Sequence, residues 1–115
     1  MKKIVFADDD STIQDVINLI LEDEYKVTIF SKGEPLLNNE FELPDLFLLD
    51  KQLSGIDGLE VCRFLKTQES TRHIPVIMIS ATPNISSLAK AAGADGVIEK
   101  PFPIQQLRQL IATYI

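Results

Sequence analysis

Residues 46–58 read LFLLDKQLSGIDG, and this stretch decides the fold. Four consecutive apolar residues, Leu46–Leu49, are followed by Asp50 and a turn that contains glycine. A continuously apolar strand is expected where helices cover both faces of a parallel sheet, whereas a half-exposed strand alternates. Val76–Ile79 is a second run of the same kind. These two runs therefore predict the buried central strands of an α/β protein.

On either side of this stretch, short apolar runs alternate with segments of helical periodicity. The alternation predicts a five-stranded parallel sheet in the doubly wound, flavodoxin-like order 2-1-3-4-5, flanked by five helices. Lys26–Phe30 comes closer to a polar and apolar alternation, which indicates an edge strand. The predicted strands are Lys3–Ala7, Lys26–Phe30, Leu46–Leu49, Val76–Ile79 and Gly96–Glu99; helices are predicted from Ser11, over Glu34–Asn39, Gly58–Thr67 and Asn84–Ala92, and from Pro103.

Several residues mark helix ends. Ser11 is a predicted N-cap, and Gln14, three residues later, completes a capping box. Gly93 is a favourable residue just beyond the end of the fourth helix. Pro103 is a favoured first-turn residue for the last helix.

The composition limits the class of protein. The chain has 115 residues and a formal net charge of −6, and 45% of its residues are hydrophobic, so one domain spanning residues 1–115 is expected. No apolar run approaches the roughly 20 residues of a membrane-spanning helix, so no membrane partner is expected. The acidic balance argues against direct nucleic-acid binding. A single cysteine, Cys62, cannot form an internal disulfide, and a reducing, cytoplasmic location is therefore expected.

Acidic residues follow two of the predicted strands, at the edge of the sheet where such folds bind ligands. Asp8, Asp9 and Asp10 follow the first strand, and Asp50 follows the third. These strands are neighbours in the predicted order, so their acids should lie together. Crowded carboxylates repel one another, and a divalent cation removes this repulsion. Oxygen ligands favour Mg²⁺, and a main-chain carbonyl after Asp50 is a further ligand to expect.

A hydroxyl and an ammonium are expected beside these acids, because Ser80 follows the fourth strand and Lys100 the fifth. With Mg²⁺ bound, a phosphoryl group can enter such a site, and one carboxylate can attack phosphorus. The metal, Lys100 and Ser80 would stabilise the equatorial oxygens of the transition state. The pattern therefore predicts phosphoryl transfer to an aspartate.

Five separately placed segments, spread over nearly the whole chain, carry a combined signature: Ile4–Asp10, Leu48–Gly58, Pro75–Ala81, Gly93–Gly96 and Lys100–Phe102. In content and order they resemble the receiver domains of bacterial response regulators in two-component systems, of the single-domain chemotaxis type.

The resemblance implies a phosphorelay role for the acids. Asp50 corresponds to the aspartate that accepts a phosphoryl group from a phosphohistidine of a sensor histidine kinase or phosphotransfer protein. Asp8 and Asp9 correspond to the Mg²⁺-binding acids, with Asp9 the more direct ligand. Gln52 corresponds to the position whose main-chain carbonyl binds the metal.

The resemblance also implies a switch rather than a turnover enzyme. Ser80 corresponds to the residue that moves toward the phosphoryl group, and Lys100 to the lysine that pairs with the phosphorylated aspartate. A cis Lys100–Pro101 bond is expected, as is usual in the family. Phosphorylation and dephosphorylation would be self-catalysed, and the output protein or effector domain is not identified.

Three positions depart from the family pattern. Val97 replaces the aromatic residue that often swings inward on activation, and Ser54 replaces a common proline. The segment Thr82–Ala92 is about two residues shorter than usual. No effector domain is expected after the last helix, so the chain is interpreted as a stand-alone regulator or an excised receiver domain.

Two other functions remain open from the sequence. In Asp8-Asp9-Asp10-Ser11-Thr12, Asp8 and Asp10 resemble the nucleophile and acid/base of haloacid-dehalogenase-type phosphatases, although Asp50 has no role in that scheme. A receiver-fold interaction module independent of phosphorylation is the other alternative, because Val97 weakens the usual switch. With one His and one Cys, a zinc site is not expected, and His73 is interpreted as a surface residue.

Overall fold

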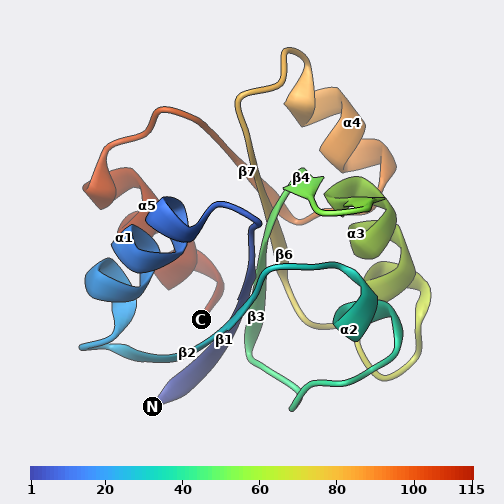
Figure 1. The fold of residues 1–115 in the computed structure, drawn as a ribbon, viewed down its shortest axis with the longest axis horizontal. Helices are drawn as coiled ribbons and strands as arrows, with labels where there is room; N and C mark the ends of the chain where they lie inside the picture. The colour runs from blue at the N-terminus through green and yellow to red at the C-terminus, as the bar shows by residue number, and fades with distance from the viewer.

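Five parallel strands form one sheet in the order β2-β1-β3-β6-β7 (Figure 1). The computed structural model describes all 115 residues. Each pairing is parallel, with Ile4 of β1 opposite both Val27 and Leu46. The predicted order is confirmed, because the two additional short strands lie outside this sheet. The sheet strands are β1 Lys2–Ala7, β2 Tyr25–Phe30, β3 Leu46–Asp50, β6 Val76–Ser80 and β7 Gly96–Glu99.

Helices cover both faces of the sheet, as the apolar central strands require. Figure 1 shows α1 and α5 on one side and α2, α3 and α4 on the other. The helices are α1 Ser11–Leu21, α2 Glu34–Leu37, α3 Gly58–Thr67, α4 Ile85–Ala91 and α5 Ile104–Tyr114.

Strand β3 divides its side chains between two hydrophobic cores. Leu46 and Leu48 pack with residues of α1 and α5, whereas Phe47 and Leu49 pack with residues of α3 and α4. All four side chains are fully buried. Burial of such a side chain is worth about 1.5–3 kcal/mol, so β3 fixes the centre of the sheet. Asp50 is thereby placed where this rigid strand ends.

Strand β2 confirms the predicted edge strand. Lys26 and Thr28 are exposed, and the residues between and after them are only half-buried. The alternation arises because β2 has a single neighbour, β1, in the sheet.

The predicted N-cap of α1 is wrong. Asp10, not Ser11, caps the helix: its Oδ1 accepts hydrogen bonds from the main-chain N–H groups of Thr12 and Ile13. Gln14 makes no capping box, and its side chain turns instead to the carbonyl oxygen of Asp8. A carboxylate is a strong acceptor at a helix N-terminus, where the first N–H groups have no partner in the helix.

The other helix boundaries differ from the predictions by a few residues. Helix α2 ends at Leu37 rather than Asn39, and α4 begins after Asn84. Pro103 is the N-cap of α5, so the helix proper begins at Ile104. The range predicted for α3 is confirmed, as is the cis Lys100–Pro101 bond. None of the helices is both long enough and apolar enough to cross a membrane.

A small hairpin after Asp50 escaped prediction, since its strands have two residues each. Strand β4 (Gln52–Leu53) pairs antiparallel with β5 (Ile56–Asp57). The hairpin returns the chain so closely that a Cβ atom at Gly58 would lie 2.0 Å from the carbonyl oxygen of Asp50. Glycine is therefore required where α3 begins beneath the end of β3.

Candidate functional site

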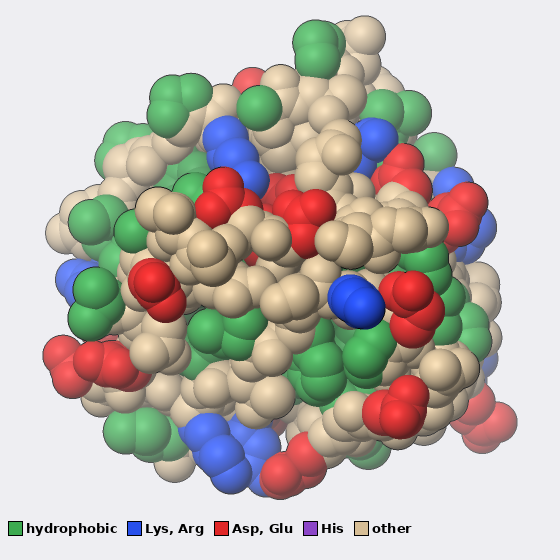
Figure 2. All heavy atoms as spheres, viewed as in Figure 1, with side chains coloured by type: hydrophobic (Ala, Val, Ile, Leu, Met, Phe, Trp, Pro, Cys, Tyr) green, Lys and Arg blue, Asp and Glu red, His purple; other side chains and the backbone are tan.

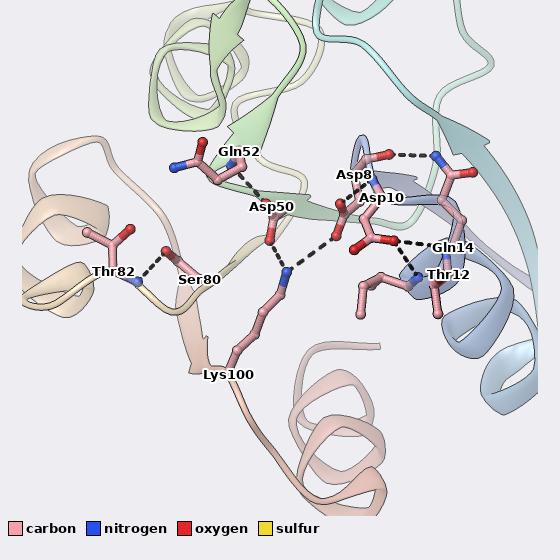
Figure 3. Close-up of polar contacts among 10 residues, drawn as sticks. Asp8, Asp10, Thr12, Gln14, Asp50, Gln52, Ser80, Thr82 and Lys100 are labelled. Atoms are coloured by element: carbon pink, nitrogen blue, oxygen red, sulfur yellow. Dashed lines mark hydrogen bonds and ion pairs between the residues drawn. The ribbon is translucent and has the colours of Figure 1, made fainter.

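The carboxyl edge of the sheet brings four of the predicted site residues together. Asp8 follows β1, Asp50 and Ser80 end β3 and β6, and Lys100 follows β7. The register places Asp50 opposite Ile79, one residue before Ser80. Their side chains converge from four adjacent strands (Figure 3).

Lys100 lies between two buried carboxylates. Its Nζ is 2.7 Å from Asp50 Oδ1 and 3.5 Å from Asp8 Oδ2. Asp50 is 2% exposed and Asp8 is 1% exposed. Two carboxylates and one ammonium leave a net negative charge in a region of low dielectric. Such a site favours a further cation.

Each acid has one oxygen held by the main chain and one that faces Lys100. Asp8 Oδ1 accepts the N–H of Asp10 at 2.9 Å, and Asp50 Oδ2 accepts the N–H of Gln52 at 2.8 Å. Asp8 Oδ2 and Asp50 Oδ1 are buried and accept no well-directed hydrogen bond. Both oxygens depend on the ion pairs with Lys100, so one ammonium is shared between two buried carboxylates and a further cation would find acceptors there.

The electrostatics of the site follow from burial and charge. Burial raises the pKa of Asp8 above its ordinary value, and the charge of Asp50 adds to the rise. The Asp10 N–H and Lys100 oppose it. For Lys100, burial lowers the pKa, but the contacts and charges of Asp50 and Asp8 outweigh it and raise the pKa overall. Lys100 therefore remains an ammonium at neutral pH.

A cavity of about 280 Å³ opens beside Asp50. Ser80 contributes a hydroxyl, whose oxygen accepts the N–H of Thr82 at 2.9 Å (Figure 3). Because one water molecule takes about 30 Å³, the cavity has room for a phosphoryl group and several waters. Its lining consists of Asp50, Gln52, Ser80, Ala81, Thr82 and Lys100.

The surface around this cavity carries the charges that the sequence suggested. In the space-filling view, acidic side chains gather beside a basic one above the middle of the face (Figure 2).

Asp9 is exposed, unlike Asp8, and no three His, Cys, Asp or Glu side chains are grouped so as to hold a metal. Asp8, Asp50 and the Gln52 segment nevertheless fit Mg²⁺, because they offer hard oxygen donors, two of them unsatisfied.

A second, mostly apolar cavity of about 460 Å³ adjoins the first. Lys100 and Ala81 line both cavities. Val16 of α1 and Ile104 of α5, on its rim, are 44% and 49% exposed. The acid site therefore adjoins an apolar surface between α1 and the start of α5.

Family comparison identifies this arrangement. The sequence profile described as the response regulator receiver domain matches residues 4–112. The chain belongs to this family. Receiver domains act as phosphoacceptor switches of two-component systems and work with histidine kinases, so the predicted class of function is confirmed.

Curated relatives of this receiver domain are longer proteins. It is 33% identical over 111 residues to the phosphate regulon transcriptional regulatory protein PhoB of Rhizobium meliloti (strain 1021). The match covers 93% of the chain and 49% of that protein. The chain thus spans about half the length of this relative.

Solved receiver domains share the fold over nearly the full chain. The receiver domain of the sensor histidine kinase PA1611 from Pseudomonas aeruginosa, 26% identical, has a TM-score of 0.89 and contains a magnesium ion coordinated in its active-site cleft. The alignment covers 98% of this chain and 96% of that one. The chemotaxis response regulator CheY4 of Vibrio cholerae, 24% identical, shares the fold with a TM-score of 0.90, covering 100% and 99%.

The phosphatase alternative lacks support from both the family and the geometry. In that scheme Asp10 would act as acid/base beside Asp8, but Asp10 is exposed and its Oδ1 caps α1. Asp50, which has no role there, is the buried acid nearest Lys100. The receiver interpretation accounts for Asp50 as the acceptor and for Asp10 as the helix cap.

Sequence reasoning missed the contacts of Gln14 and Ser31. The Gln14 Nε2 donates to the Asp8 carbonyl oxygen at 2.6 Å and to Ser31 Oγ at 2.9 Å. The spacing of Gln14 from Ser11 had indicated only a cap. No local pattern could have found this contact, because Ser31 lies 17 residues further along the chain.

Proposed function

We propose that this receiver domain is a phosphorylation switch in which Asp50 accepts a phosphoryl group from a phosphohistidine. The donor would be a sensor histidine kinase or a phosphotransfer protein. The observation that carries the proposal is the buried Oδ1 of Asp50, which accepts no directed hydrogen bond, lies 2.7 Å from Lys100 and borders a cavity lined by Ser80.

Asp8, Asp9 and Asp50, with the main-chain carbonyl of Gln52, are the proposed Mg²⁺ ligands. Bound Mg²⁺ would neutralise the carboxylates and attract the phosphoryl oxygens. Asp8 is held for this role by the N–H of Asp10, and Asp50 by the N–H of Gln52. Asp9 is exposed, so its carboxylate is accessible to an ion that arrives from solvent.

Transfer to Asp50 is an exchange of one bond for another. A carboxylate oxygen of Asp50 attacks phosphorus, a P–O bond forms, and the P–N bond to the donor imidazole breaks. The electron pair of the broken bond returns to the imidazole nitrogen. Lys100 and the Ser80 hydroxyl stabilise the charge on the equatorial oxygens. Since Lys100 already lies between the acids, little reorganisation is needed.

The switch itself would be a change of partner at Ser80. Its oxygen accepts the N–H of Thr82 in the present arrangement, and its hydroxyl proton is free to be donated to a phosphoryl oxygen. A movement of Ser80 toward the phosphoryl group would carry the loop after β6 and the start of α4. Val97 of β7 is half-buried, so the face of α4, β7 and α5 would change without an inward aromatic residue.

Hydrolysis of the acyl phosphate would reset the switch. Gln52 and Thr82 line the cavity together with Asp50, so we expect them to flank the approach of the attacking water. We assign the self-catalysed loss of the phosphoryl group to this route. The lifetime of the phosphorylated form would then depend on the size of these two side chains.

The wider context follows the family. Residues 1–115 would act as one receiver unit in the cytoplasm, with an output partner or effector domain still to be identified. The apolar cavity between α1 and the start of α5 shares Lys100 with the acid site, and this supports it as the surface that meets the phosphodonor.

The deciding experiment is incubation with acetyl phosphate, with mass spectrometry of the intact protein. A gain of one phosphoryl group with Mg²⁺, and none with EDTA, is expected. Labelling of Asp50→Asn to the wild-type extent would refute the proposal. NMR shifts with beryllofluoride and Mg²⁺ test the alternative of an inert interaction module, which predicts no response.

A further inference from the structure

The loop after β2 is linked to both of the loops that carry the proposed metal ligands. On one side, Ser31 Oγ accepts a hydrogen bond from Gln14, whose other contact is Asp8. On the other side, Lys32 forms an isolated parallel bridge with Ser54, two residues after Gln52. The segment 31–33 therefore connects the end of β1 with the hairpin after β3.

Gln14 fixes the main chain of Asp8. Its Nε2 lies 2.6 Å from the Asp8 carbonyl oxygen, while the N–H of Asp8 donates to the carbonyl of Phe30 at 3.0 Å. The Asp8 carbonyl belongs to the peptide that leads into Asp9. Figure 3 shows the Gln14 amide turned toward the Asp8 carbonyl oxygen. Holding this peptide therefore constrains how the chain leaves the strand toward Asp9.

Ser31 completes the connection through the same amide nitrogen. A primary amide has two N–H donors, and Gln14 directs them to two different segments of the chain. Gly33 then packs closely on the other side, since a Cβ there would lie 3.0 Å from Val61 and 3.4 Å from Ile56. Segment 31–33 thus has contacts at both of its ends, and little free space remains around Gly33.

We propose that Gln14 and Ser31 are positioning residues that hold the Asp8–Asp9 loop at a fixed separation from the Gln52 loop, and so set the affinity for Mg²⁺. This inference rests on the proposed function. Neither residue touches the metal in the proposal, since Gln14 acts on the Asp8 peptide and Ser31 acts on Gln14. Groups outside the ligand shell of a metal commonly change its affinity about 10–100-fold.

The test compares variants by ¹H–¹⁵N NMR. Gln14→Met keeps the length of the side chain but removes both donors, and we expect about tenfold weaker Mg²⁺ binding. Ser31→Ala removes one acceptor, with a loss of about threefold expected, and Ser31→Thr should retain the affinity. Asn18→Ala is the matched control, because Asn18 lies on the same helix and its amide contacts only Glu22.

A second readout needs no metal. In the metal-free protein, Gln14→Met should shift the amide resonances of Asp9 and Asp10, whereas Asn18→Ala should not. Thermal unfolding measures any loss of stability separately from affinity.

Wild-type affinity and unshifted resonances in Gln14→Met would overturn the inference, as would an equal loss in Asn18→Ala. If the unaltered protein binds no Mg²⁺ at millimolar concentration, the proposed function fails as well. If instead the unaltered protein and the variants all bind Mg²⁺ equally well, only the inference about Gln14 and Ser31 fails.

Discussion

Acids lie beside lysines both where the strands of the sheet begin and where they end, and we call these two sides of the sheet its amino and carboxyl edges. The acids have different roles at the two edges. At the edge where strands begin, Asp95 Oδ2 accepts the N–H of Val76 at 2.9 Å and the ammonium of Lys66 at 2.8 Å. Asp45 likewise accepts the N–H of Lys3 at 2.7 Å. These acids join neighbouring strands.

At the edge where strands end, the acids are left partly unsatisfied. Asp8 and Asp50 obtain one N–H each from their own loops, and their remaining oxygens share Lys100. The comparison shows that a satisfied carboxylate supports architecture, whereas a buried, unsatisfied one indicates a site for chemistry. Substitutions at the two edges should therefore have opposite consequences.

The largest expected difference is in phosphoryl acceptance. Asp50→Asn should abolish labelling by acetyl phosphate, because an amide oxygen is a poor nucleophile. Asp45→Asn should be labelled like the unaltered protein, since that residue lies at the far edge of the sheet. Intact mass spectrometry measures both, and equal labelling of the two variants would remove the functional distinction between the edges.

The next largest effect is expected from removing the lysines. Lys100→Met leaves two buried carboxylates without their cation. In metal-free buffer we therefore expect the free energy of unfolding to fall by about 2–4 kcal/mol. Millimolar Mg²⁺ should restore much of this stability. Lys66→Met should lose about 1–2 kcal/mol, since Lys66 also donates to the Ile74 carbonyl.

Urea unfolding with and without Mg²⁺ measures both lysine variants. Recovery of Lys66→Met by Mg²⁺ to the same degree as Lys100→Met would show that the ion does not act at the acid site.

Neutralising one acid at each edge should change stability in opposite directions. Asp95→Ala removes an acceptor from a buried N–H and should cost about 1–3 kcal/mol. Asp8→Asn should raise the melting temperature at pH 7 by about 2–4 °C, a gain below 1 kcal/mol. The gain is expected because burial disfavours the charged form of Asp8 and raises its pKa.

The pH dependence fixes the sign of this effect. A carboxyl with a raised pKa contributes stability below its ordinary value of 3.8, and that contribution is lost as pH rises through the raised pKa. The advantage of Asp8→Asn should therefore be absent near pH 3 and grow toward neutral pH. A difference that stays constant across this range would contradict the explanation.

The smallest expected effect concerns Cys62, which lies in the core near Lys66. Burial raises the pKa of its thiol to about 11, so alkylation at pH 8 should be very slow in the folded protein. Asp95→Ala should increase the alkylation rate severalfold by loosening the neighbouring strand starts, whereas Asp50→Asn should not. Thiol labelling followed over hours measures this difference.

The sequence was most informative where a single strand determines the outcome. Leu46–Leu49 and Val76–Ile79 are apolar throughout because both faces are covered, and this pattern predicted the centre of the sheet. The rule that ligands bind beyond strand ends then placed Asp8, Asp50, Ser80 and Lys100 together.

Contacts between side chains from distant segments could not be predicted in this way. The spacing of Ser11 and Gln14 fitted a capping box, but Asp10 supplies the cap and Gln14 contacts Asp8 and Ser31. The pairing of Lys66 with Asp95 likewise depends on how α3 packs against β6, beside the turn that leads into β7. Tertiary packing determines the partners of these side chains, and local sequence periodicity does not predict tertiary packing.

The start of α3 at Gly58 packs directly against the main chain of Asp50, on one side of the acid site. The start of α3 leaves no room for even a methyl group below the Asp50 carbonyl, so the acceptor strand cannot yield in that direction. If Asp50 is phosphorylated as proposed, we therefore expect the displacement in the loop after β6, whose Ala81 and Thr82 line the same cavity. The tight contact at Gly58 would then make the response of the domain one-sided.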